Sequence, residues 1–353
     1  MSPDRLEDMR MTVEFGLDTF GDVTWDSGKR LLPQREVLRH VVEEAVLADE
    51  VGVDVIGLGE HHRDDFAISA PEILLAAIGA RTSRIRLGTA VTVLGADDPV
   101  RLFQRFSTLD AISGGRAEVT LGRGSFTESF PLFGFDMADY HTLFEEKLDL
   151  FARLIRQEEV TWSGTTRAPL ERQRVWPPLG EQGLRCWIGV GGSPESVVRA
   201  VRYRMPMILA IIGGSARRFL PFVDLYRRAS DQAGLAPMPL GVHSPGHVAP
   251  TDEQARDEAF PAYKALHDRI GSERGWPSLR REDFLREVEH GSMYVGAPET
   301  VARRIADTVG ALDLARFQLK YSMGPLDHGA LMRSIELYGR QVLPMVRDML
   351  ARG

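Results

Sequence analysis

At 353 residues, with 43% hydrophobic and 26% charged residues, the chain is long enough to bury a large core. Its net charge of −7, from 43 basic and 50 acidic residues without long runs of one sign, excludes the basic surface typical of nucleic-acid binding. A single cysteine, Cys186, excludes an intramolecular disulfide framework, and no stretch has the length of a membrane span or the apolar core of a signal peptide. We therefore expect a cytoplasmic protein whose partners are small molecules.

Along the chain, short strand-like runs alternate with amphipathic helical stretches, which is the pattern of parallel strands joined by crossover helices. Eight such units follow one another. The sequence therefore predicts an α/β protein with a single (β/α)8 TIM-barrel domain over 11–353, after a disordered leader over 1–10. The expected strands are Val13–Phe20, Val53 up to Glu60, Ile85–Leu94, Arg116–Leu121, Cys186–Val190, Met207–Ile212, about Leu240–Val248 and Phe317–Tyr321.

The expected helices follow these strands, and several begin with proline at the first helical position. Two segments fall outside the repeating pattern. A hairpin insertion is predicted at about 160–180, and an insertion with helical patterning at about 250–290. The clearest helices are predicted over Gln34–Glu50, from Pro71, from Pro99, over Leu143–Arg156, from Pro194, from Pro298 and over Ala330–Leu350.

Three ionisable residues in a row, Glu60, His61 and His62, follow the second expected strand. Active sites of such barrels lie at the carboxyl ends of the strands. Because successive strand residues point to opposite faces, Glu60 and His62 share one side and His61 takes the other. A single histidine in such a place more often caps a loop or pairs with a core carboxylate, but three ionisable residues together favour a functional site.

A glycine-rich loop, Gly191-Gly192-Ser193, joins the fifth expected strand to a helix. Its glycines allow close approach of a ligand, and the free N–H groups of the helix start favour an anion, with Ser196 in the first turn. Ser193 and Pro194 are also explained by ordinary helix capping. Arg123, after the fourth strand, is a second candidate for holding phosphate, because its guanidinium can donate to two oxygens. Neighbouring strands would bring both features to one rim.

The third expected strand carries small residues near its carboxyl end, where Ala90 leaves room for a flat ring. Alternation of small and large side chains inside barrels is an equally good explanation. A metal at Glu60, His61 and His62 is disfavoured, because consecutive strand residues cannot all converge on one ion and no H-E-x-x-H spacing occurs. No metal is expected.

Taken in order, these motifs resemble the bacterial luciferase-like monooxygenases, flavin-dependent (β/α)8 barrels whose family also includes deazaflavin (F420)-dependent dehydrogenases. The resemblance covers nearly the whole chain from Met11. It rests on the spacing of several short motifs rather than on any one of them. These are Glu60-His61-His62, Gly88-Thr89-Ala90-Val91 with Asp98-Pro99-Val100-Arg101, Gly114-Gly115-Arg116 to Gly122-Arg123-Gly124, Gly191-Gly192-Ser193 and Met205-Pro206-Met207.

The resemblance implies a role for each motif. His61 takes the place of the histidine that assists oxygen chemistry, and Glu60 orients it or lines the floor of the site. A non-proline cis peptide under the flavin ring maps to Ala90-Val91. Arg123 maps to the phosphate-binding arginine, and Gly191, Gly192, Ser193 and Ser196 map to the cofactor-binding loop.

Bacterial luciferase itself has a cysteine where Gly122 stands and a glutamate where Gly192 stands, so the resemblance does not extend to light emission or to the luciferase substrate. It implies a monooxygenase that receives reduced FMN from a separate flavin reductase. Oxygen would add at C4a of the flavin, with His61 donating or relaying a proton, a role that suits a histidine whose pKa lies near neutral. A homodimer is expected. The alternatives are an F420-dependent oxidoreductase, in which His61 assists hydride transfer, and a non-catalytic flavin-binding protein.

Overall fold

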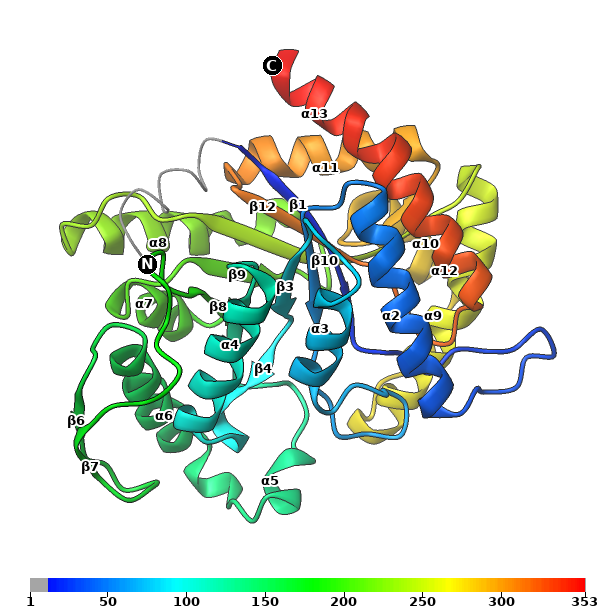
Figure 1. Cartoon of the computed structure of the whole chain (residues 1–353). Coiled ribbons are helices and arrows are strands. Elements are labelled where there is room, and N and C mark those ends of the chain that lie inside the picture. Colours follow the sequence, from blue (N-terminus) through cyan, green and yellow to red (C-terminus); the bar gives the residue numbers. More distant parts are fainter. Residues whose placement is uncertain (1–11, 353) are drawn as a thin grey trace.

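A computed structural model describes residues 12–352, so the leader predicted over 1–10 lies outside the described residues. Parallel strands pair in the order β3-β2-β1-β12-β10-β9-β8-β5-β4, and a parallel bridge between Leu87 and Ala117 brings β3 beside β5. Eight strand positions therefore close a barrel, as predicted, with helices around it (Figure 1). The strands are β1 (Glu14–Thr19), β2 (Val55–Leu58), β3 (Arg86–Thr89), β4 (Thr92–Val93), β5 (Glu118–Gly122), β8 (Arg185–Val190), β9 (Met207–Ala210), β10 (Leu240–Val248) and β12 (Arg316–Lys320).

The outer layer consists mainly of the helices that follow these strands. They are α2 (Gln34–Glu50), α3 (Pro71–Gly79), α4 (Pro99–Ser113), α6 (Tyr140–Leu154), α7 (Pro194–Arg202), α8 (Leu220–Gln232), α11 (Pro298–Leu312), α12 (His328–Leu337) and α13 (Leu343–Arg352). Within the described residues, no helix combines the length and apolar content needed to cross a membrane.

Helix α4 shows how local chemistry sets the ends of a helix. The Asp98 carboxylate accepts hydrogen bonds from the backbone N–H groups of Val100 and Arg101, and Pro99 occupies the first helical position. The helix stops at Gly114, whose φ of 70° is the left-handed conformation that favours glycine.

Two expected elements, the third strand and the last helix, are divided in the structure. The third strand is broken into β3 and β4 at Ala90-Val91. The seventh strand has the expected bounds, Leu240–Val248, and runs unbroken through Pro245 and Gly246. A Cβ at Gly246 would stand 2.6 Å from the Tyr294 carbonyl oxygen, so glycine lets the short strand β11 (Tyr294–Gly296) pair with β10. The last helix is divided by a π-helical turn, Tyr338–Val342.

The segments predicted as insertions lie outside the barrel. The antiparallel strands β6 (Val160–Trp162) and β7 (Leu170–Gln173) form a hairpin beside α6 (Figure 1), and the Trp162 indole N–H donates to Asp149 of α6. The second segment forms two helices, α9 (Asp252–Arg274) and α10 (Arg281–His290).

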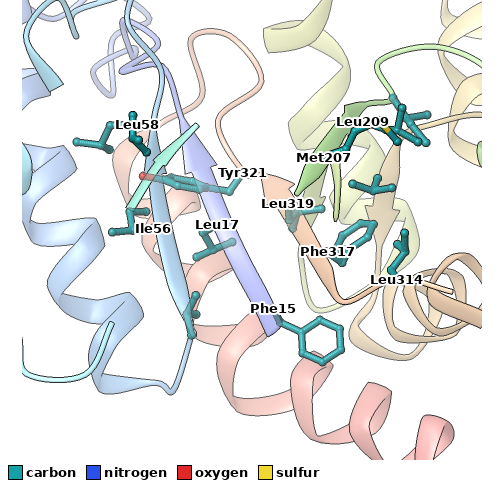
Figure 2. Close-up of a cluster of buried hydrophobic side chains, with 14 of the residues drawn as sticks. Phe15, Leu17, Ile56, Leu58, Met207, Leu209, Leu314, Phe317, Leu319 and Tyr321 are labelled. Carbon is teal, nitrogen blue, oxygen red and sulfur yellow. The ribbon is translucent and has the colours of Figure 1, made fainter. Parts of the chain in front are cut away.

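The main hydrophobic core lies between the barrel and its helices. Apolar side chains at alternate positions of β1, β2, β9 and β12 form part of it, as Figure 2 shows for Leu17, Ile56 and Leu319. On β1 and β12 the intervening residues are glycine or polar groups, of which Asp18 on β1 and Gln318 on β12 are bonded to each other. Because strand side chains alternate, an apolar outer face leaves these polar groups for the barrel interior, where the cavity described below lies.

Candidate active site

A cavity of about 380 Å³ lies at the carboxyl ends of the barrel strands, where barrel active sites occur. Its lining includes most of the residues proposed from the sequence, namely Glu60, His61, Ala90, Val91, Arg123, Gly191 and Ser196, together with His62. Gly192 and Ser193 are next to it in the loop before α7. Glu195, which would repel an anion, is exposed and does not line the cavity.

His61 sits among aromatic rings. Its imidazole centroid lies 4.4 Å from that of Phe20, 4.5 Å from that of Phe66 and 5.5 Å from that of Phe126. The polar contact of the ring is between Nδ1 and the Gly59 carbonyl oxygen, at 3.3 Å. The His61 ring is buried, and the part of it that remains exposed faces the cavity rather than bulk water. This burial lowers the pKa of the imidazole to about 4. The near-neutral pKa expected from the sequence is therefore wrong, and His61 is neutral at physiological pH.

Glu60 is bonded to His62 rather than to His61. One carboxylate oxygen lies 2.9 Å from His62 Nε2, and the other accepts a hydrogen bond of 2.8 Å from the Val93 backbone N–H. Glu60 therefore ties β4 to the loop after β2. Of the two roles considered for Glu60, lining the site agrees with this geometry and orienting His61 does not. For His62, pairing with a carboxylate is an adequate structural explanation.

The peptide bond between Ala90 and Val91 is cis, as the resemblance implied. The Val91 side chain also explains Gly122, because a Cβ there would stand 2.5 Å from one Val91 methyl group. A cysteine at position 122 would therefore require Val91 to move. The departure from luciferase at this position thus has a packing reason.

The start of α7 and the loop after β5 both line the cavity and carry the residues expected to bind an anion. Ser193 caps the helix by accepting from the Ser196 N–H, and its hydroxyl donates to Ser196 Oγ at 2.8 Å. Arg199, one turn later, donates to the same Ser196 oxygen at 3.0 Å. Arg123 lies with its guanidinium 5.4 Å from the centre of the Tyr140 ring, and both residues line the cavity. Positive charge, hydroxyl groups and a helix N-terminus suit a phosphate group.

The opposite wall carries buried polar residues that the sequence reading missed. Asp18, His243, Gln318 and Lys320 come from the adjacent strands β1, β10 and β12, and each is less than a tenth exposed. Their strands alternate polar and apolar residues, which on an open sheet indicates one solvated face. In a closed barrel that is covered by helices, neither face of a strand is solvated. Polar residues near the carboxyl ends of these strands could therefore have been expected to point into the barrel interior.

No metal is needed to explain the triplet, because Glu60 and His62 bond to each other. Elsewhere, His40, Glu43 and His328 place one potential ligand atom each within 4.8 Å of the others. The two imidazoles are stacked at 3.8 Å and nearly parallel, with 10° between planes. Their in-plane lone pairs therefore run side by side instead of converging on one ion.

Known proteins that are similar to this chain include monooxygenases and an F420-dependent dehydrogenase. The model of the family described as luciferase-like monooxygenase matches residues 19–313. The 4-hydroxyprotoasukamycin monooxygenase of Streptomyces nodosus subsp. asukaensis is 27% identical over 327 residues, which cover 88% of this chain and 87% of that protein.

Three solved structures share the fold. Monooxygenase RslO1 from Streptomyces bottropensis has a TM-score of 0.82 at 24% identity and covers 94% of this chain and 99% of its own. The oxygenating constituent of 3,6-diketocamphane monooxygenase from Pseudomonas putida, in complex with FMN, has a TM-score of 0.75 at 20% identity, with 95% and 99% covered. An F420-dependent secondary alcohol dehydrogenase in complex with an F420–acetone adduct has a TM-score of 0.72 at 17% identity, with 96% and 100% covered.

Proposed function

Because the chain belongs to the luciferase-like monooxygenase family, we propose that it is an enzyme that uses reduced FMN and O2 to oxygenate a small organic substrate. One observation carries the proposal: a single cavity is lined by Arg123 and Ser196, by the cis peptide Ala90-Val91, and by His61 among aromatic rings. These three features suit the phosphate, the ring and the reacting face of a flavin.

Each residue has a defined task in this proposal. Arg123, Ser196 and the backbone of Gly191, Gly192 and Ser193 hold the phosphate, and Ala90 and Val91 support the ring. Reduced flavin supplies the electrons that activate O2. His61, neutral because of its burial, accepts and passes on a proton at the cavity, while Glu60 keeps the loop after β2 fixed to β4.

A deazaflavin cofactor is the second candidate, and the fold shared with an F420-dependent dehydrogenase favours keeping it. Both cofactors carry a phosphate and a flat ring, but the cavity end at Arg123 and Ser196 suits a terminal phosphate better than an internal phosphodiester. With F420, His61 would assist hydride transfer at a substrate carbon. A third candidate is a flavin-binding protein without catalysis. A flavin reductase partner, a homodimer and a cytoplasmic location belong to the proposal as expectations.

The test is a titration of the purified protein with FMN and with F420 in both redox states, followed by absorbance. We expect reduced FMN to bind most tightly, and a protein that bound neither cofactor would overturn the proposal. Turnover is then measured with a reductase, O2 and candidate aldehydes, ketones and phenols. Oxygenated product above uncatalysed peroxide release supports an enzyme, and its absence supports the third candidate.

The variant His61→Ala tests the proton-transfer role. It should retain FMN affinity within about threefold and lose most of the oxygenation rate. His290→Ala is the matched control, because the His290 side chain is 78% exposed on α10. An undiminished rate in His61→Ala would refute the assignment of this histidine.

A further inference from the structure

A histidine and an aspartate inside the barrel form a bonded pair to which the proposed flavin chemistry gives no role. His243 Nδ1 lies 2.6 Å from Asp18 Oδ2. The second carboxylate oxygen, Oδ1, accepts a hydrogen bond of 2.8 Å from Gln318 Nε2. Asp18 is 0% exposed and His243 is 8% exposed.

This pair fixes which ring nitrogen of His243 is available. Carboxylate oxygens accept hydrogen bonds, so in the neutral tautomer that fits this contact Nδ1 donates to Asp18 and Nε2 is left as an acceptor. Among the described residues, Nε2 has no hydrogen-bond partner, and the ring lines the cavity. The cavity therefore meets a basic nitrogen backed by a carboxylate, which is the arrangement of a general base.

Two neighbouring glycines leave the space that the Asp18 carboxylate and the Gln318 side chain occupy. A Cβ at Gly57 on β2 would stand 2.1 Å from Asp18 Oδ1, and a Cβ at Gly16 would stand 2.9 Å from the Gln318 side chain. Packing alone does not call for this pair, because well-packed apolar residues are often as stabilising as buried ionic ones. The pair also leaves one nitrogen open to the cavity, which a purely structural role does not need.

His243 lies near the proposed reaction centre. Its ring is parallel to Phe20 within 10°, with centroids 6.0 Å apart, and the same Phe20 ring lies 4.4 Å from His61. The His243 wall belongs to β1, β10 and β12, whereas the proposed phosphate site lies after β5 and β8. A substrate between these two sides would contact His243 and the flavin at once.

We propose that His243, oriented by Asp18, binds and deprotonates a hydroxyl group of the substrate, and that this substrate is a phenol or an enol. The inference rests on the proposed oxygenase function. In the step, the substrate O–H bond breaks, an N–H bond forms at His243 Nε2, and the electron pair stays on the substrate oxygen. Asp18 balances the charge of the imidazolium. The anion is delocalised onto carbon, which makes that carbon a better nucleophile toward an electrophilic oxygen.

The class of substrate is limited by the acidity of a hydroxyl group that an imidazole can deprotonate. The hydroxyl of a phenol has a pKa of about 10, close enough to that of an imidazole for transfer, whereas an aliphatic alcohol is far less acidic. Aldehydes, alkanes and thioethers have no hydroxyl proton to donate. They would leave His243 Nε2 without a partner on the buried wall of the cavity, at a cost in affinity.

The test uses the full-length protein without flavin and two probes of similar shape, 4-nitrophenol and 4-nitroanisole. The first can donate and lose a proton and changes its visible absorption when it does, whereas the second cannot. At a pH where free 4-nitrophenol is mostly protonated, we expect the wild-type protein to bind it at least tenfold more tightly than 4-nitroanisole. The bound probe should show the phenolate band.

Two variants distinguish a role of His243 as a base from a role in maintaining the fold. In His243→Gln the phenolate band should disappear and the affinity for 4-nitrophenol should fall about tenfold, to that for 4-nitroanisole. Asp18→Asn keeps the ring but removes the carboxylate that fixes its proton on Nδ1, so the band should also be lost. Thermal unfolding verifies that each variant is folded, and His290→Gln is the matched control.

The proposal is overturned if the wild-type protein binds both probes equally, binds neither, or shows no phenolate band. A band that persists in folded His243→Gln also overturns it. Because no flavin is present, these outcomes are independent of the proposed function. A protein that failed to bind reduced FMN but passed this test would lose the oxygenase assignment and keep the phenol site.

Discussion

Glu60 is hydrogen-bonded to His62, its neighbour but one in the chain, with 2.9 Å between Oε1 and Nε2. The other carboxylate oxygen receives the Val93 N–H on β4. This relationship assigns a structural task to two members of the Glu60-His61-His62 triplet. The third, His61, is left among the aromatic rings of the cavity.

The variants Glu60→Ala and Glu60→Gln test this task. Glu60→Ala leaves the buried Val93 N–H without its partner, so we expect the free energy of unfolding to fall by about 1–3 kcal/mol. Glu60→Gln keeps an acceptor oxygen of similar reach and should lose less than half as much. Urea unfolding of both variants provides the measurement. Equal losses would contradict a specific role for the Val93 bond.

The sequence predicted the barrel well because its main signal, strand–helix alternation, is local and repeated eight times. It also placed Glu60, His61, Arg123 and Ser196 near one another, since strand ends of a barrel meet at one rim. The pairing of Asp18 with His243 could not be predicted, because it joins residues 225 positions apart on β1 and β10, two strands that come to lie on either side of β12 only in the folded barrel. The pKa of His61 was missed for a similar reason: Phe20 and Phe126 reach the ring from distant loops.

Acid should destabilise the protein through His61. Burial lowers the pKa of this ring to about 4, from an ordinary value of about 6.5. Above pH 6.5 the ring is neutral in both folded and unfolded chains and has no effect. As the pH falls from 6.5 toward 4, only the unfolded chain takes up this proton, so stability is lost.

The variant His61→Gln cannot take up that proton. We expect it to lose less stability than the wild type between pH 7.5 and pH 4.5, by about 2 kcal/mol, because the pKa of the ring is lower in the folded chain than in the unfolded chain. Denaturant unfolding at several pH values measures this difference. Parallel pH profiles for the two proteins would show that His61 is not held neutral.

Removal of the Arg123 guanidinium should weaken the binding of phosphate-bearing flavins selectively. We expect Arg123→Ala to lower the affinity for FMN at least tenfold, because a charged hydrogen bond contributes about 1.5–3 kcal/mol. The affinity for riboflavin, which has no phosphate, should be nearly unchanged. Fluorescence titration of both flavins is the measurement, and Arg101→Ala, an exposed arginine on α4, is the control. An equal loss for FMN and riboflavin would place Arg123 away from the phosphate.

The free energy of unfolding should be most sensitive to loss of a buried charge at the amino ends of the barrel strands, opposite the cavity. Arg316 is 0% exposed, lies 4.4 Å from the centre of the Trp187 ring, and is paired with Glu14 and Glu118, with 2.9 Å between Nη2 and Glu118 Oε2. Burial opposes ionisation of Glu14, but Arg316 and Arg185 outweigh it and lower the pKa of Glu14 to about 2. The group is therefore charged throughout the physiological range.

Glu118→Ala would leave Arg316 buried with half of its counter-charge. We expect it to lower the free energy of unfolding by about 3–5 kcal/mol, the range for breaking a buried ion pair. Asp348→Ala removes a carboxylate of the exposed pair with Arg352 and should have no measurable effect, because water and salt screen that pair. Urea unfolding of both variants decides the matter. A small loss for Glu118→Ala would mean that Glu14 alone compensates Arg316, and Glu14→Ala would then become the damaging substitution.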